Sequence, residues 1–223
     1  MKQNWYKVLA VILLIYTVVA GFLGEVPHLP ILHETIRNLY FHVTMWFTMM
    51  TLFSIALVQS ILYLRSPNEH RDIVSAQAVN VGLAFGVLGL LTGSLWAKYT
   101  WGAWWTNDPQ LNGAAITILA YLAYSLLRKS IDDGEKKARI AAVYNIFAFV
   151  MMVVFIGIIP KFTGVDSLHP GKGGNPGFNT YDLDKNLRLV FYPAVLAWIL
   201  LGLWILNLRI RTQKLNLLIN DEQ

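Results

Sequence analysis

The chain has 223 residues, of which 56% are hydrophobic and only 14% are charged, whereas roughly 25% of the residues of an average soluble domain are charged. This composition excludes an ordinary soluble domain and indicates an integral membrane protein. The formal net charge of +5 is spread along the chain without forming a basic face, which argues against nucleic acid as a partner. The absence of cysteine excludes disulfides, thiolate metal ligands and thioether attachment of a cofactor.

Six apolar runs follow one another along the chain, and a run of about 17–25 residues can span a bilayer as a helix. They cover residues 8–24, 39–64, 76–96, 113–127, 140–159 and 187–206, the fourth being the shortest. We therefore expect an all-α integral membrane protein whose residues 1–223 form a single domain of six transmembrane helices.

The first run resembles a secretory signal because Lys2 and Lys7 precede it. It is longer than the usual signal core of about 7–15 residues and has no clear small-x-small cleavage site after it. We expect it to be retained as a membrane span.

The distribution of Lys and Arg predicts the orientation of the chain, since cytoplasmic loops carry the excess of these residues. The side of the termini carries Lys2, Lys7, Arg65, Arg71, Arg128, Lys129, Lys136, Lys137, Arg139, Arg209, Arg211 and Lys214. The other side carries Arg37, Lys98, Lys161, Lys172, Lys185 and Arg188. Both termini are therefore predicted to be cytoplasmic, and residues 25–38, 97–112 and 160–186 to form external loops.

The second external loop is rich in tryptophan. Residues Trp101, Trp104 and Trp105, followed by Asp108, lie within the 12 residues from Trp101 to Asn112. Tryptophan at a membrane boundary is often a simple interfacial anchor, because its ring is apolar while its indole N–H seeks a partner. Three flat rings and a carboxylate packed so closely indicate instead a surface that receives a flat, apolar ligand.

The third external loop, residues 160–186, contains His169 and a segment rich in glycine and proline. Structureless loops longer than about 12–15 residues are usually functional or disordered, so this loop either closes over a ligand or is disordered. The third span carries Gly82, Gly86, Gly89 and Gly93, a spacing that lets helix backbones approach closely. We expect it to pack inside the bundle, with a homodimer face as the alternative.

Histidine is the best candidate ligand in a chain without cysteine. The five histidines are His28, His33, His42, His70 and His169, and none lies deep in a predicted span. This placement argues against a transmembrane b-type cytochrome, which holds haem between buried histidines. The spans also lack central acidic or basic residues, which argues against a proton-coupled transporter or ion pump.

His42 opens the second span at the outer membrane boundary, and His169 lies on the same side. Two external imidazoles, a tryptophan platform and no thiolate favour haem bound at the outer surface through axial histidines. Arg37, together with Lys98, Lys161 or Lys172, is a candidate to neutralise the haem propionates, and plain interfacial charge is the alternative for these cations.

The segment Trp101-Gly-Ala-Trp-Trp-Thr-Asn-Asp108 resembles the tryptophan-rich WWD signature of the haem-handling family of cytochrome c biogenesis, whose usual form is W-G-x-x-W-x-W-D. The segments Arg37-Asn-Leu-Tyr-Phe-His42-Val and Ser167-Leu-His169 are similar to the histidine segments on either side of that signature. Six spans in 223 residues are similar to the short haem exporter branch of the family. The chain departs from the signature at Asn107, where the family usually has tryptophan, and Trp104 is the nearest ring to replace it.

The resemblance implies a non-enzymatic protein of the bacterial inner membrane that holds haem b without a covalent bond. His42 and His169 would be the axial ligands, with Trp101, Trp104, Trp105 and Asp108 forming the platform. The resemblance also implies partners, namely a periplasmic haem chaperone that receives the haem and the subunits of an ABC-type transporter.

The sequence is also compatible with two other functions. The chain could be a subunit of a haem lyase that attaches haem to apocytochrome c with a partner protein. It could also be a permease or structural subunit of a transporter complex, whose external aromatic residues only anchor it in the membrane lipid.

Overall fold

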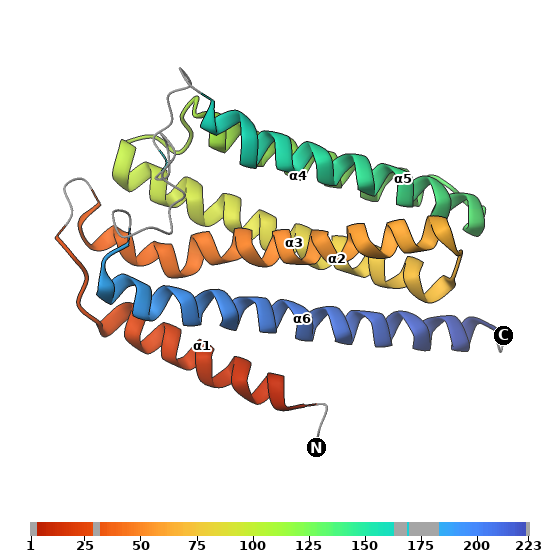
Figure 1. The fold of residues 1–223 in the computed structure, drawn as a ribbon, viewed down its shortest axis with the longest axis horizontal. Helices are drawn as coiled ribbons and strands as arrows, with labels where there is room; N and C mark the ends of the chain where they lie inside the picture. Colours follow the sequence, from red (N-terminus) through yellow and green to blue (C-terminus); the bar gives the residue numbers. More distant parts are fainter. Residues whose placement is uncertain (1–3, 29–31, 163–168, 170–182, 222–223) are drawn as a thin grey trace.

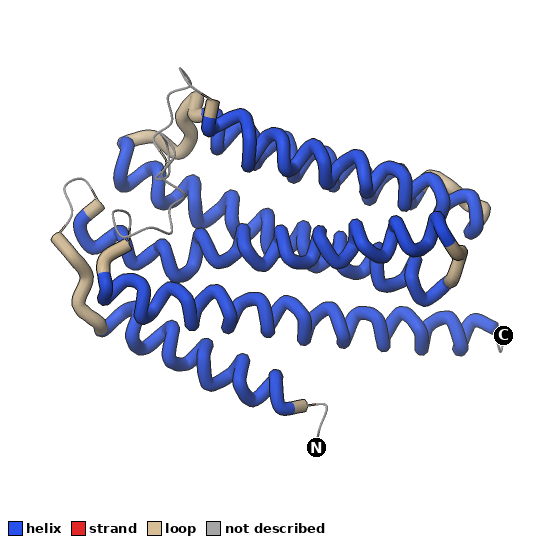
Figure 2. The backbone as a smooth tube through the Cα atoms, viewed as in Figure 1, coloured by secondary structure: helices blue, strands red, loops and turns tan. Residues whose placement is uncertain are grey.

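The computed structural model describes residues 4–28, 32–162, 169 and 183–221. Their regular structure is helical throughout, with no strand (Figure 2). Six helices are long and apolar enough to cross a membrane, which confirms the predicted fold class. They are α1 (Trp5–Leu23), α2 (Thr44–Arg65), α3 (Glu69–Trp101), α4 (Pro109–Lys129), α5 (Gly134–Met152) and α6 (Lys185–Asp221).

Short irregular helical turns adjoin two of these helices. A 3₁₀-helix, η1 (His33–Asn38), and a π-helix, η2 (Leu39–Val43), lead into α2. A second π-helix, η3 (Val153–Ile158), and a 3₁₀-turn, η4 (Ile159–Lys161), continue α5. The second predicted span therefore begins with a π-helix. The fifth predicted span ends with a π-helix followed by a 3₁₀-turn.

Three helices begin at polar side chains that accept backbone N–H groups of the first turn, as N-cap residues do. Asn68 caps α3, Asp108 caps α4 and Asp133 caps α5. At α4 the cap is followed by Pro109, a residue that suits the first helical position because it lacks the N–H that would go unpaired there.

The Trp-rich loop is shorter than predicted. Helix α3 continues through Trp101 and α4 begins at Pro109, so only residues 102–108 of the predicted loop 97–112 lie between the two helices. The fourth span is correspondingly longer than the predicted 113–127. Of the predicted loop 160–186, residues 163–168 and 170–182 lie outside the described part of the chain.

Helix α2 occupies the centre of the bundle and contacts α3, α5 and α6. Helix α1 lies at one edge, where it packs against α6, and α4 and α5 pack together at the opposite edge (Figure 1). The main apolar core lies between α2, α3, α4 and α5, where the rings of Phe53 and Tyr121 stack with their centroids 3.6 Å apart.

The glycines of α3 form the surface on which α2 packs, which confirms the predicted packing inside the bundle. Each glycine lies against a side chain of α2 or of the adjoining η2, and the pairs are Gly82 with Phe53, Gly86 with Met49, Gly89 with Trp46 and Gly93 with His42. Gly86 also lies against Ile118 of α4. A methyl group added at any of the four would come within 3 Å of the facing side chain. The glycines thus set how closely the two helices approach.

Polar contacts join the helices at the end of the bundle opposite to His42. Arg128 of α4 forms a two-pronged ion pair with Asp72 of α3, and both side chains are largely buried, at 19% exposure each. Deeper in the bundle, Ser60 of α2 hydrogen-bonds to Ser75 of α3 and accepts from the buried amide of Asn145 of α5. These contacts connect four helices.

Candidate haem site

The predicted site residues gather at one end of the bundle. The start of α2, the end of α3 and the start of α4 meet there because successive helices run in opposite directions (Figure 1). This arrangement places His42 next to α3, while Trp101 and Asp108 stand at the two ends of the Trp-rich loop. The structure also brings His169 to the same place.

His42 lies in the π-helix η2 and is buried, with 9% of its surface exposed. A π-turn inside a helix often marks a functional position. The ring packs directly on the backbone of α3, where a methyl group at Gly93 would lie 2.5 Å from its Cε1 atom. His42 is therefore held within the helix contact rather than displayed on the surface.

The hydrogen bonds of His42 fix which ring nitrogen carries the proton. Its Nδ1 lies 3.0 Å from the carbonyl oxygen of Gly89 and 3.2 Å from the hydroxyl oxygen of Thr92. Because a carbonyl oxygen can only accept, Nδ1 donates to Gly89. The neutral imidazole then carries its lone pair on Nε2, the nitrogen available for binding a metal.

Two tryptophans enclose the ring of His42. Trp46 and Trp96 meet it edge to face, with ring centroids 6.2 and 5.8 Å away. The indole N–H of Trp96 donates to the hydroxyl of Thr35 in η1 at 3.0 Å. This bond ties η1 to α3 beside the histidine.

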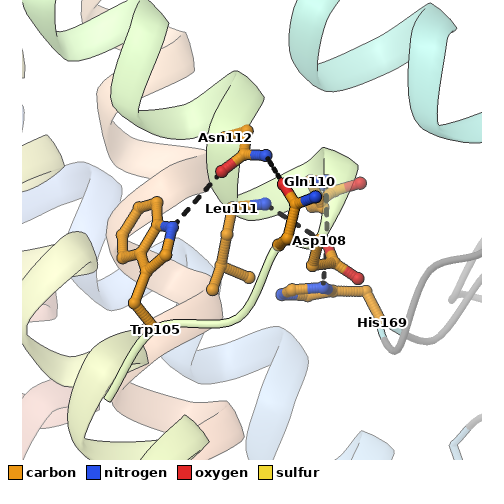
Figure 3. Close-up of polar contacts among 7 residues, drawn as sticks. Trp105, Asp108, Gln110, Leu111, Asn112 and His169 are labelled. Carbon is orange, nitrogen blue, oxygen red and sulfur yellow. Dashed lines mark hydrogen bonds and ion pairs between the residues drawn. The ribbon is translucent and has the colours of Figure 1, made fainter. Parts of the chain in front are cut away.

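His169 is oriented by Asp108. The Nδ1 atom of His169 lies 3.0 Å from Oδ1 of Asp108, whose side chain is only 1% exposed (Figure 3). The same carboxylate oxygen accepts the backbone N–H groups of Gln110 and Leu111, at 2.8 and 3.3 Å. A carboxylate oxygen held by the first turn of α4 therefore fixes the imidazole, and a neutral His169 carries its lone pair on Nε2.

The two histidines differ in exposure. The side chain of His169 is 24% exposed, more than that of the buried His42. The site therefore has one enclosed histidine and one that borders on solvent.

The three tryptophans of the signature do not share one environment. Trp101, at the end of α3, meets the ring of His169 edge to face at 5.3 Å. Trp104 and Trp105 are 58% and 43% exposed. Trp101 therefore belongs to the histidine pair, whereas the other two rings present apolar surface outward.

Asn107, the departure from the family signature, takes part in holding the loop. The side-chain amide nitrogen of Asn112 donates to the side-chain oxygen of Asn107 at 2.8 Å. The side-chain oxygen of Asn112 accepts the indole N–H of Trp105 at 3.3 Å (Figure 3). The side chain at position 107 therefore braces Trp105 through Asn112.

The candidate cations have partners of their own. Arg37 donates from Nη1 to the carbonyl oxygens of Gly21 and Gly24 at the end of α1, and from Nε to Glu34. Lys98 donates to the carbonyl oxygen of Gly102 at the loop's start. A contact from either cation to a haem propionate stays a prediction, and Lys172 lies outside the described residues.

The residues of α3 that surround His42 are not identified by any motif in the sequence. Its members are Gly89, Thr92, Gly93 and Trp96, all on α3. The glycine spacing of α3 predicts close helix packing at Gly89 and Gly93 but not a histidine beside them. Their spacing is a signal that one face of α3 admits a close neighbour, but the identity of that neighbour depends on the register between α2 and α3.

The sequence matches the family described as Heme exporter protein C over residues 1–221. A Heme exporter protein C of Bradyrhizobium diazoefficiens is 30% identical over 120 residues, which cover 54% of this chain and 46% of the relative. Another, from Paracoccus denitrificans, is 24% identical over 181 residues, 80% of this chain and 73% of that protein.

A third relative is the Cytochrome c biogenesis protein CcsA of Prochlorococcus marinus, 37% identical over 100 residues, 45% of this chain and 31% of the relative. The chain thus spans less than half the length of two of these three relatives. The match over residues 1–221 nevertheless covers nearly the whole sequence. This multi-pass membrane protein therefore belongs to the Heme exporter protein C family.

Proposed function

We propose that this protein binds haem b non-covalently on the outer face of the bacterial inner membrane and delivers it to a periplasmic haem chaperone for cytochrome c maturation. The observation that carries the proposal is the matched orientation of two histidines. His42 and His169 each donate from Nδ1 to a fixed oxygen, Gly89 O and Asp108 Oδ1. A hydrogen bond of this kind holds a metal-ligating histidine in its tautomer and raises the basicity of the other nitrogen.

The residues present fit haem as a ligand. Haem supplies an iron whose two axial positions accept imidazole nitrogen, together with a flat apolar ring that suits aromatic walls. His42 and His169 would hold the iron, and Trp101 would lie against the ring next to His169, which it already contacts. Trp104 and Trp105 would extend this apolar surface, while Asp108 keeps His169 aligned.

Delivery to a partner needs only an exchange of axial ligands, so no covalent chemistry is required of this chain. The more exposed His169 and the outward Trp104 and Trp105 are the side of the site that a soluble partner can reach. His42 stays enclosed by α3 and two tryptophans. This asymmetry supports a haem-transfer protein rather than an enzyme.

The orientation and the partners belong to the same proposal. Both termini would lie in the cytoplasm, as the excess of Lys and Arg on that side favours, and the site would face the periplasm. The family description as an exporter supports subunits of an ABC-type transporter as partners within the membrane. A relative named for cytochrome c biogenesis supports contact with the apocytochrome machinery as the second candidate.

The ligand assignment is tested by absorption spectra of haem in the purified protein. His42→Ala and His169→Ala are each expected to lose haem or to shift its Soret band, because one axial ligand is removed. His33→Asn is the matched control, since His33 is an exposed histidine at the same end of the bundle. If both alanine variants keep the haem content and spectrum of the unmodified protein, the assignment is wrong.

Delivery is tested separately by co-purification. A small soluble haem chaperone retained on the haem-loaded protein supports the carrier function. Retention of apocytochrome c instead, without a chaperone, would favour a lyase subunit. Protein that never carries haem and tolerates Trp101→Ala would favour a permease or structural subunit.

A further inference from the structure

A groove runs between α3 and α6 away from the haem site. It has a volume of about 420 Å³ and is lined by apolar side chains that include Ala84 and Leu88 of α3 and Trp198 and Ile205 of α6. All four lie in helices that are long and apolar enough to span the membrane. A hollow of this kind on a bundle surrounded by hydrocarbon is filled by hydrocarbon, because the apolar walls offer water no partners.

One end of the groove is polar. Arg209 of α6 and Asn80 of α3 line it there, and both side chains are exposed. The Nε atom of Arg209 donates to the amide oxygen of Gln77, a residue with only 7% of its surface exposed. This bond directs the guanidinium toward α3, over the end of the groove.

None of the carboxylates in the described part of the chain pairs with Arg209. Among the described residues, the Lys and Arg side chains within ion-pair distance of a carboxylate are Arg37 and Arg128, so Arg209 has no such partner there. A cation at the edge of the hydrocarbon region without a carboxylate attracts anionic lipid headgroups. Arginine also forms paired hydrogen bonds to phosphate.

The length of the groove matches one leaflet of a bilayer. Trp198 and Arg209 mark its two ends on α6, and 11 residues of α-helix rise by roughly 16 Å. The hydrocarbon core of a bilayer is about 30 Å thick, so the groove is as long as half of it. An acyl chain that starts at a headgroup near Arg209 would therefore reach Trp198.

From these observations we propose that the α3–α6 groove is a binding site for an anionic phospholipid. One acyl chain lies along Ala84, Leu88 and Ile205, and the phosphate is bound by Arg209 and Asn80. Arg209 lies at the end of the bundle opposite to His42, so the lipid belongs to the leaflet on that side. The site is independent of the haem site.

Native mass spectrometry of the purified protein in mild detergent tests this proposal. The protein is titrated with phosphatidylglycerol and, separately, with phosphatidylcholine of the same acyl chains. We expect phosphatidylglycerol to bind more tightly, and Arg209→Gln to weaken its binding about tenfold, the effect of losing a hydrogen bond to a charged group. Arg211→Gln is the matched control, because Arg211 is exposed on the same helix but does not line the groove.

A second variant tests where the acyl chain binds without changing the charge of the protein. Ala84→Leu adds a larger apolar side chain inside the groove and is expected to weaken phosphatidylglycerol binding while Arg209 is intact. An unchanged haem spectrum in both variants establishes that they are folded, since the haem site lies at the other end.

Three outcomes would overturn the proposal. The first is equal binding of phosphatidylglycerol and phosphatidylcholine. The second is equal loss of lipid in Arg209→Gln and Arg211→Gln, which would indicate a general attraction to basic residues. The third is wild-type phosphatidylglycerol affinity in Ala84→Leu.

Discussion

An alanine at position 93 would place a methyl group against the ring of His42. The added Cβ would lie 2.5 Å from Cε1, 3.1 Å from Nδ1 and 3.4 Å from Nε2, whereas ordinary contacts begin at 3.4 Å. The ring must therefore move by roughly 1 Å, because the backbone of a packed helix yields little. Such a movement would strain the 3.0 Å bond from Nδ1 to Gly89.

The expected effect of Gly93→Ala on haem binding is large. Loss of a hydrogen bond that orients a metal-ligating histidine typically weakens metal binding about 10- to 100-fold, and displacement of Nε2 adds to this. We expect a dissociation constant for haem raised by at least about tenfold and a changed Soret band. Titration of the haem-free protein with haem, followed by absorption, measures both.

Gly82→Ala provides the matched control. Its Cβ would lie 2.5 Å from Cε1 of Phe53, an equally severe contact on the same pair of helices but away from the haem site. Both substitutions should lower thermal stability similarly, since overpacking costs about 1–3 kcal/mol. Wild-type haem binding by Gly93→Ala, or an equal loss of haem in both variants, would refute a specific role for Gly93 in positioning His42.

Three further substitutions separate binding from stability. Asp108→Asn should weaken haem binding about 10- to 100-fold, because asparagine no longer presents a carboxylate to His169. The melting temperature should change little, because asparagine still caps α4. An unchanged haem affinity would contradict the role of Asp108. Arg128→Leu should cost about 3–5 kcal/mol of stability by leaving Asp72 buried and unpaired, as measured by thermal unfolding. The Soret spectrum should stay unchanged, and a double leucine variant at both positions should recover part of the stability. Arg37→Gln should lower the melting temperature, because it removes hydrogen bonds to the end of α1. If Arg37 also binds a haem propionate, as predicted, the same variant should bind haem more weakly.

The six spans could be predicted because each depends only on the composition of a local window. Their ends were less predictable. Helix α4 begins at Pro109 because Asp108 caps it. The apolar run begins only at residue 113, so hydrophobicity alone places the start of this helix too late. Likewise, α3 continues to Trp101 because nothing in the sequence before Gly102, which adopts a left-handed conformation with φ of 80°, interrupts the helix.

The candidate site was only partly predictable for a different reason. Residue type and predicted side of the membrane point to His42 and His169, and the structure brings both to one end of the bundle. The burial of His42 and its bond to Gly89 depend on the register between α2 and α3, since a shift of one residue would turn another side chain toward Gly93. Register is a property of the whole helix contact, and no local pattern specifies it.

The two histidines are supported by different kinds of structure, and this difference bears on how a bound ligand could be handed on. His42 is held by the packing of α2 on α3, which cannot move without opening the core. His169 hydrogen-bonds to the carboxylate of Asp108 at the start of α4 and is more exposed. Under the proposed function, a partner can therefore displace His169 while His42 keeps its place, so that transfer begins at the external histidine and the bundle itself stays closed.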